Sequence, residues 1–344
     1  MKYFWKENVM NEEPILFVRK PGELPAGHLL VPAAEIIKVS NTSGEMVYEE
    51  GRDFCLSGDR RKIVLMENSR IPTLDAAELI RTPGDPHSHR GIRAEDPHLL
   101  YYEGEFFPDL QPRFTYLHNG WDGAEPVIHS GLLPLTHEKL KNKDPLRMVV
   151  FGDSISAGYN ATGTINIPPF CSAYDKQTAT ELERIYGTEV ICKNVSLNGM
   201  SALWALQNID RVLNEKPDLL ILAWGMNDAS ERVPDSDYIF ALCRIMEEVR
   251  KVFPLVEFLL VATMRANPQW TFSCPEFYMS YLKGLEKQVK PGVALADMTS
   301  MWAELIRRKS YLDLTGNGLN HPNDFGHSIY AQLITATILG DEKQ

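Results

Sequence analysis

Short apolar runs separated by turn-forming residues dominate the chain up to residue 140. Helix-length periodic segments are few in this part, and clusters of Gly, Pro, Asn and Asp stand between the runs. Runs at this spacing are typical of the strands of a β-sandwich or jelly roll. The pattern predicts about seven strands. They cover residues 15–18, 29–31, 36–39, 46–48, 63–66, 99–102 and 114–117.

The pattern changes after residue 145, where short apolar runs alternate with amphipathic segments. In residues 202–214, for example, apolar side chains recur every three or four positions along one helical face. This alternation predicts a doubly wound parallel sheet of five strands in flavodoxin-like order, with helices on both faces. The predicted strands are residues 148–151, 189–192, 219–224, 258–263 and 293–297.

The two patterns together predict two domains. A chain of 344 residues is long for a single hydrophobic core. We expect a β-sandwich accessory domain over residues 1–140 and an α/β catalytic domain over residues 141–344. The segment 132–145, which contains two prolines and a run of charged residues, is the expected linker.

Candidate chemistry begins where the first strand of the α/β part ends. Gly152-Asp153-Ser154 follows that strand directly. Ligands of open α/β sheets bind at the carboxyl ends of the strands, so a hydroxyl here is well placed to act as a nucleophile. The same three residue types are also common in ordinary turns, and the tripeptide alone does not decide between the two interpretations.

Three further polar stretches follow later elements of the α/β part. Gly199, after the second strand, can turn a backbone N–H toward a ligand, or serve only as a turn glycine. Asn227, after the third strand, offers a side-chain N–H suited to an oxyanion, or caps a helix. His321 stands beside a proline-defined turn near the C-terminus. Their order along the chain favours one catalytic site over several unrelated turns.

This order of motifs resembles that of the SGNH (GDSL) hydrolase superfamily. The resemblance covers the chain from residue 146 onward. The preceding β-rich part looks like the accessory sandwich found in some carbohydrate esterases of the superfamily. The matching blocks are Gly152-Asp153-Ser154, Gly199, Gly225-Met226-Asn227-Asp228 and His321-Pro322-Asn323.

The resemblance implies a serine esterase that needs no metal and no organic cofactor. Ser154 would attack an ester carbonyl after His321 takes its proton. The backbone N–H groups of Ser154 and Gly199, together with the Asn227 side chain, would form the oxyanion hole.

One position departs from the pattern of the superfamily. An aspartate usually stands three residues before the catalytic histidine, and here that position is Gly318. Asp324 and Asp313 are the nearest carboxylates that could orient His321, and Asn317 or Asn320 could offer an amide oxygen. A Ser–His dyad supported by a backbone carbonyl is the alternative.

Residues beside the blocks are expected to line a substrate pocket. Aromatic faces there favour a sugar alcohol, and the absence of a long apolar segment favours a short acyl group such as acetyl. The predicted function is therefore a serine esterase acting on a small-molecule ester or an acylated carbohydrate. The alternatives are a thioesterase or lysophospholipase-like enzyme of the same fold, or a catalytically weak carbohydrate-binding protein. The expected pocket residues are Tyr159, Asn160, Trp204, Trp224, Met226, Arg265 and Trp270.

Composition narrows the expected partners. The net charge of −11 argues against a nucleic acid or an anionic membrane as partner. The five cysteines are irregularly spaced and predict neither a disulfide framework nor a zinc site. The first residues lack the pattern of a signal peptide, and we therefore expect a cytoplasmic protein. A homo-oligomer is left open.

Overall fold

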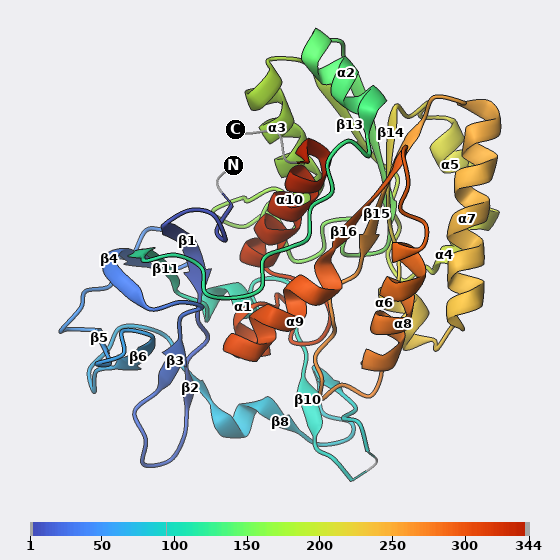
Figure 1. Cartoon of the computed structure of the whole chain (residues 1–344). Coiled ribbons are helices and arrows are strands. Elements are labelled where there is room, and N and C mark those ends of the chain that lie inside the picture. Colours follow the sequence, from blue (N-terminus) through green and yellow to red (C-terminus); the bar gives the residue numbers. More distant parts are fainter. Residues whose placement is uncertain (1–2, 94, 341–344) are drawn as a thin grey trace.

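Figure 1 shows the computed structural model, which describes residues 3–93 and 95–340. A parallel sheet lies between two layers of helices, and smaller antiparallel sheets lie beside it on the N-terminal side. The fold class predicted from the hydrophobic pattern is confirmed in both parts.

The central sheet has the strand order β13-β12-β14-β15-β16, and every neighbouring pair is parallel. This is the flavodoxin-like order, with the first strand of the sheet between the second and the third. Strands β14 and β15 are buried at every position, because helices cover both faces of the sheet. The strands are β12 (Leu146–Gly152), β13 (Val190–Asn194), β14 (Leu219–Ala223), β15 (Glu257–Ala262) and β16 (Val293–Asp297).

Helices cover the sheet on both sides (Figure 1). On one face α3 (Tyr174–Tyr186) packs against α10 (Asp324–Leu339). The other face carries α4 (Ala202–Gln207), α7 (Asp235–Val252) and α8 (Pro275–Glu286). The remaining helices of this part are α5 (Asp210–Leu213), α6 (Met226–Ser230), α9 (Met298–Arg308) and the short η2 (Tyr311–Asp313).

The expected linker contains a helix, α2 (Pro134–Asn142). Pro134 suits the first helical turn, where no backbone N–H is needed. The carboxylate of Glu257 accepts the N–H groups of Leu135 and Thr136, which stabilises the start of the helix. The segment therefore contains an ordered helix that packs against the sheet, and its role as a linker between two domains stays a prediction.

The described residues of the N-terminal part form three three-stranded antiparallel sheets and one two-stranded parallel sheet. One has the order β1-β11-β4 and another the order β3-β6-β5. These two pack on each other through the rings of Phe54 and Phe114, 5.7 Å apart. The strands are β1 (Val9–Pro14), β4 (Ala33–Ser40), β11 (Arg113–His118), β3 (Ala26–His28), β5 (Phe54–Leu56) and β6 (Lys62–Leu65).

The other two sheets are built from strands of two or three residues. Strand β2 (Val18–Arg19) pairs with β7 (Leu74–Asp75), and β10 (His98–Leu100) pairs with β8 (Ile80–Arg81) and β9 (Ser88–His89). The short helices η1 (Ala76–Leu79) and α1 (Phe106–Asp109) flank them.

Not every apolar run of this part is a strand. Residues 29–31 form a buried loop, and residues 46–48 contribute only an isolated bridge at Val47. Other segments hold this loop in place, because the side chains of Arg61 and Arg308 both donate to the Leu30 carbonyl. Burial against neighbouring segments accounts for these apolar runs without a strand.

One continuous hydrophobic core runs through both parts of the chain. At their contact, Lys309 Nζ lies 2.5 Å from Glu13 Oε1, and both side chains are completely buried. The division into domains at residue 140 remains a prediction.

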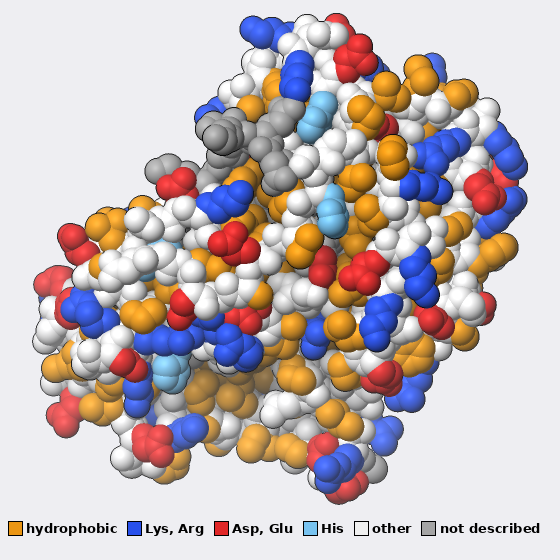
Figure 2. Space-filling model, viewed as in Figure 1, with side chains coloured by type: hydrophobic (Ala, Val, Ile, Leu, Met, Phe, Trp, Pro, Cys, Tyr) orange, Lys and Arg blue, Asp and Glu red, His pale blue; other side chains and the backbone are white. Residues whose placement is uncertain are grey.

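The surface offers no large area of a single charge on the face drawn in Figure 2, where acidic and basic side chains are interspersed. None of the helices in the described part of the chain is both long and apolar enough to cross a membrane.

Candidate active site

Ser154 lies in the tight turn that follows β12. The Asp153 carboxylate accepts the N–H of Ile155 at 3.0 Å, which holds the turn. Gly152 leaves no space for a Cβ, because Ser156 and the Ala223 carbonyl lie against it. The turn therefore places Ser154 at the carboxyl edge of the sheet, with 5% of its surface exposed.

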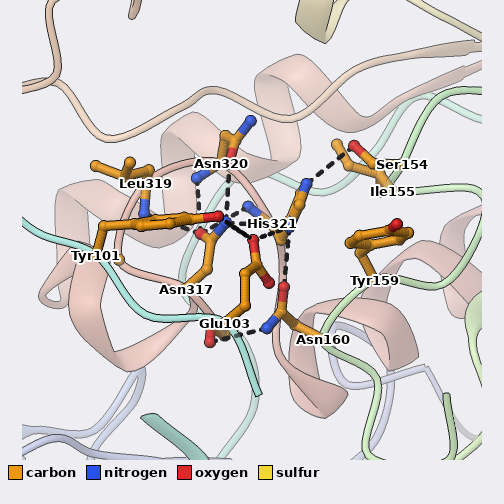
Figure 3. Close-up of polar contacts among 12 residues, drawn as sticks. Tyr101, Glu103, Ser154, Ile155, Tyr159, Asn160, Asn317, Leu319, Asn320 and His321 are labelled. Carbon is orange, nitrogen blue, oxygen red and sulfur yellow. Dashed lines mark hydrogen bonds and ion pairs between the residues drawn. The ribbon is translucent and has the colours of Figure 1, made fainter. Parts of the chain in front are cut away.

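The structure brings His321 into contact with Ser154, although 167 residues separate them along the chain. His321 Nε2 lies 2.9 Å from Ser154 Oγ (Figure 3). His321 belongs to the loop between η2 and α10, which closes on itself because Thr315 Oγ1 donates to the His321 carbonyl. A fixed imidazole beside a serine hydroxyl is the geometry of an activated nucleophile.

The other ring nitrogen, Nδ1, is surrounded by three side chains (Figure 3). Asn160 Oδ1 lies 2.9 Å away, Asn317 Nδ2 3.0 Å away and Glu103 Oε1 3.3 Å away. Asn160 has its amide orientation set by the bond from its Nδ2 to the Gly316 carbonyl. Its oxygen therefore faces the ring and can accept a proton from Nδ1.

Asn317 decides which ring nitrogen carries the proton. Its Oδ1 accepts the backbone N–H groups of Leu319, Asn320 and His321, so its amide nitrogen must face the ring. That nitrogen donates to Glu103 Oε1 and Asn320 Oδ1. With those protons engaged, Nδ1–H donates to the oxygens beside it, and Nε2 is free to accept the Ser154 proton.

Glu103 was not predicted from the sequence. It follows β10 in the N-terminal part, between Tyr101 and α1. Burial raises its pKa, but hydrogen bonds from His321, Asn317 and Tyr101 outweigh that effect and lower the pKa to about 2. Its sequence neighbourhood contains no motif. The one relevant signal is the glycine at position 318, which shows that the usual position supplies no carboxylate.

Both aspartates proposed to orient His321 are engaged elsewhere. Asp324 lies 2.5 Å from Arg113 and also accepts from Thr162. Asp313 accepts the N–H of Leu16 at 2.7 Å. The structure corrects these two predictions, since each carboxylate holds the N-terminal part against the C-terminal part instead. Asn320 reaches the ring only through Asn317.

The predicted oxyanion donors follow β13 and β14, the strands on either side of β12. Asn227 lies in the first turn of α6 and donates one amide proton to the Met200 carbonyl at 2.9 Å. Gly199 is in the same loop as Met200 and has a φ of 73°. Leu197 donates to the Gly152 carbonyl and ties this loop to the Ser154 turn. Their role as oxyanion donors stays a prediction.

The predicted pocket residues fall into two groups. Tyr159 packs the edge of its ring against His321, with 5.3 Å between ring centroids, and Asn160 contacts the same ring. Trp224 and Met226 are completely buried. Their place in the pocket is corrected: Trp224, which directly follows β14, packs on Phe151 in the core.

The remaining pocket candidates follow β15. Arg265 donates to the Met279 sulfur, and its buried Nε has no partner among the described residues. Trp270 is 7% exposed and contacts the rings of Phe272 and His89. Trp204, on α4, packs at an angle on the buried Trp224.

Metal ligands are not clustered in the described part of the chain: no group of three or more His, Cys, Asp or Glu side chains there is placed to hold an ion. The side chains described around Ser154 supply a hydroxyl, an imidazole, several amides and a carboxylate.

Comparison with known proteins gives one family. The model of the GDSL-like lipase/acylhydrolase family matches residues 150–329. No curated protein matches the chain.

Among solved structures, one similar chain is a two-domain esterase (CEX) active on acetylated mannans, co-crystallised with mannopentaose. It is 16% identical with a TM-score of 0.49, and the match covers 64% of this chain and 58% of that chain. A second is a variant of Axe2, an acetyl xylan esterase from Geobacillus stearothermophilus, with 18% identity, a TM-score of 0.46 and coverage of 58% and 97%. TesA is 16% identical with a TM-score of 0.45, over 56% and 97%.

Proposed function

The chain belongs to the GDSL-like lipase/acylhydrolase family, and from this premise we propose that it is a serine esterase for short-chain acyl esters. Its preferred substrates are acetyl esters of a carbohydrate or a small glycoside. The observation that carries the proposal is the 2.9 Å contact between His321 Nε2 and Ser154 Oγ. The other nitrogen of the same ring, Nδ1, lies beside the acceptor oxygen of Asn160.

Acylation begins when Ser154 Oγ attacks the ester carbonyl and its proton passes to His321 Nε2. The N–H groups of Ser154 and Gly199 and the Asn227 amide receive the oxyanion of the tetrahedral intermediate, each donor being worth about 2.7–4 kcal/mol. The C–O bond to the alcohol then breaks, and His321 returns the proton to the leaving alcohol.

Deacylation repeats these steps with water. His321 takes a proton from water, whose oxygen attacks the acyl-enzyme carbonyl, and the same donors hold the second oxyanion. The bond to Ser154 Oγ breaks, Ser154 recovers its proton from His321, and the free acid leaves. No electron transfer is involved.

Two features support a small acyl group and a sugar-like alcohol. Ser154 and His321 are only 5% and 7% exposed, so a bulky acyl chain would have to displace protein atoms to reach the hydroxyl. Aromatic rings lie near the site, including Tyr159 against His321, and such rings can stack on the apolar face of a pyranose.

A series of p-nitrophenyl esters from acetate to decanoate tests the proposal on the purified protein and on Ser154→Ala. We expect the highest kcat/KM on acetate and a loss of turnover in Ser154→Ala without a change in thermal unfolding. A maximum at longer chains would favour the thioesterase or lysophospholipase alternative. Absence of Ser154-dependent turnover on every ester would leave only a binding function.

A further inference from the structure

We propose that Glu103 of the N-terminal part is the positioning residue of His321, in place of the acid that is missing at position 318. Through it, the N-terminal part completes the catalytic site instead of serving as a separate accessory. The inference rests on the esterase function proposed above and deepens it.

The Glu103 carboxylate is held in place by Tyr101 and by Asn317, which also contacts the imidazole. Its Oε1 accepts the Tyr101 hydroxyl at 2.9 Å and the Asn317 amide at 3.1 Å, and it lies 3.3 Å from His321 Nδ1. Figure 3 shows these groups converging on one side of the ring, opposite Ser154. These bonds favour the ionised form, so Glu103 carries its charge throughout the neutral pH range.

Gly318 explains why the carboxylate comes from the N-terminal part. A Cβ at this position would lie 2.6 Å from the Leu100 carbonyl oxygen and 2.9 Å from Phe107 Cζ, and φ is +89°. The segment that carries Glu103 runs from Leu100 to Phe107. The segment that delivers the carboxylate thus also occupies the space that a side chain at position 318 would need.

The N-terminal part is bonded to the histidine loop at several points. Tyr102 N–H donates to the Asn317 carbonyl at 3.2 Å, next to Glu103. Gln111 Nε2 donates to the carbonyls of Leu312 and Thr315 at 2.7 and 2.9 Å. These bonds fix the distance between the two segments, so that the carboxylate remains beside Nδ1 while His321 exchanges protons with Ser154.

Glu103 and Asn160 have different roles. Asn160 lies closer to Nδ1 but is neutral, so it orients the ring without stabilising its charge. Of the other titratable groups around the ring, Tyr101 and Tyr159 are phenols, and burial lowers the pKa of His327 and keeps it neutral. Asp324 is paired with Arg113. Glu103 is therefore the carboxylate that can stabilise the imidazolium formed when Ser154 loses its proton.

The test compares Glu103→Gln with Glu105→Gln, an exposed acid two residues further along the same segment. On p-nitrophenyl acetate we expect Glu103→Gln to lower kcat/KM by about 10- to 100-fold, because the variant loses a charge-assisted hydrogen bond of corresponding strength. Most of the loss should be in kcat. The acidic limb of its pH profile moves to lower pH, because the imidazolium loses its anionic partner. Glu105→Gln behaves as the wild type.

A second variant, Glu103→Ala, opens a space beside Nδ1 at a position where 37% of the wild-type side chain is exposed. Added formate is expected to restore part of its kcat, while Glu105→Ala shows no response. The proposal is overturned if Glu103→Gln matches the wild type. It is overturned equally if activity falls with an unmoved acidic limb and formate restores nothing, since that marks a packing role.

Ser154→Ala keeps the two proposals apart. If Ser154→Ala is inactive and Glu103→Gln is unaffected, the esterase proposal survives and only the role of Glu103 fails. If Ser154→Ala retains the activity, the esterase mechanism itself fails.

Discussion

At the scale of single residues, the tautomer of His321 follows from the orientation of one amide. Asn317 receives three backbone N–H groups on its oxygen and must turn its nitrogen toward the imidazole and Glu103. The Nδ1 proton then points to Asn160 and Glu103, and Nε2 faces Ser154 with a free lone pair. The neutral amide of Asn317 thus sets the tautomer in which His321 can act as a base, before any substrate binds.

Asn227→Ala tests the oxyanion hole at the same scale. Removing one such donor costs about 2.7–4 kcal/mol of transition-state stabilisation, or roughly 100- to 1000-fold in kcat. We expect KM to change little, because the oxyanion exists only in the intermediate and not in the bound ester. Steady-state kinetics on p-nitrophenyl acetate measure this, with the exposed Asn142→Ala as control. A loss confined to KM would contradict the assignment.

At the scale of elements, the loop between η2 and α10 takes its shape from the segment between β10 and α1. Leu100 and Phe107 lie where a side chain at position 318 would extend, and Asn267 donates to the Gly318 carbonyl from the other side. A loop enclosed in this way holds His321 without contributing a carboxylate of its own.

Gly318→Ala and Gly22→Ala separate backbone strain from this close packing. Both glycines have positive φ, +89° and +76°, but Gly22 has open space around it. Gly22→Ala is expected to cost about 1–2 kcal/mol of unfolding free energy, the usual penalty of a left-handed residue. Gly318→Ala should cost more, because the new methyl group also displaces Leu100 or Phe107. Urea unfolding compares them, and equal losses would show that the packing is loose.

At the scale of the whole molecule, buried polar groups join the first and last parts of the chain. Lys309 pairs with Glu13, and Asp313 accepts from Leu16. Burial raises the pKa of Asp313 to about 7, although Lys309 and the Leu16 N–H act in the opposite direction. The contact between the two parts therefore contains a carboxyl group that titrates near neutral pH.

Asp313→Asn tests the effect of this group on stability. The folded protein keeps the Asp313 proton up to pH of about 7, whereas the unfolded chain loses it near its ordinary value of 3.8. Between these values the folded state binds more protons, so the unfolding free energy of the wild type falls as pH rises. Asparagine can still accept from Leu16 and has no proton to lose. We expect the unfolding free energy of Asp313→Asn to vary less between pH 4 and 7 than that of the wild type. The exposed Asp237→Asn is the control and should behave as the wild type. Urea unfolding measures all three proteins, and parallel curves would contradict the expectation.

The amino-acid sequence by itself determined the α/β sheet, its strand order and the pairing of Ser154 with His321. The sheet and its order follow from local hydrophobic periodicity and from the alternation of strands and helices. The pairing of Ser154 with His321 follows from the order of motifs that resembles the SGNH hydrolases. Each of these signals can be read from short stretches of the chain. The same reasoning failed for residues 29–31, where the run of apolar residues reflects a buried loop and not a strand.

Only the tertiary structure decided what holds His321. Glu103 and Asn160 reach its Nδ1 from two distant segments, while Asp324 and Asp313, which are nearer in sequence, bond to the N-terminal part. The local sequence around a carboxylate does not show which group it will contact, because that depends on which segments pack together when the core forms. Packing between remote segments made Gly318 necessary and placed Glu103 beside the imidazole.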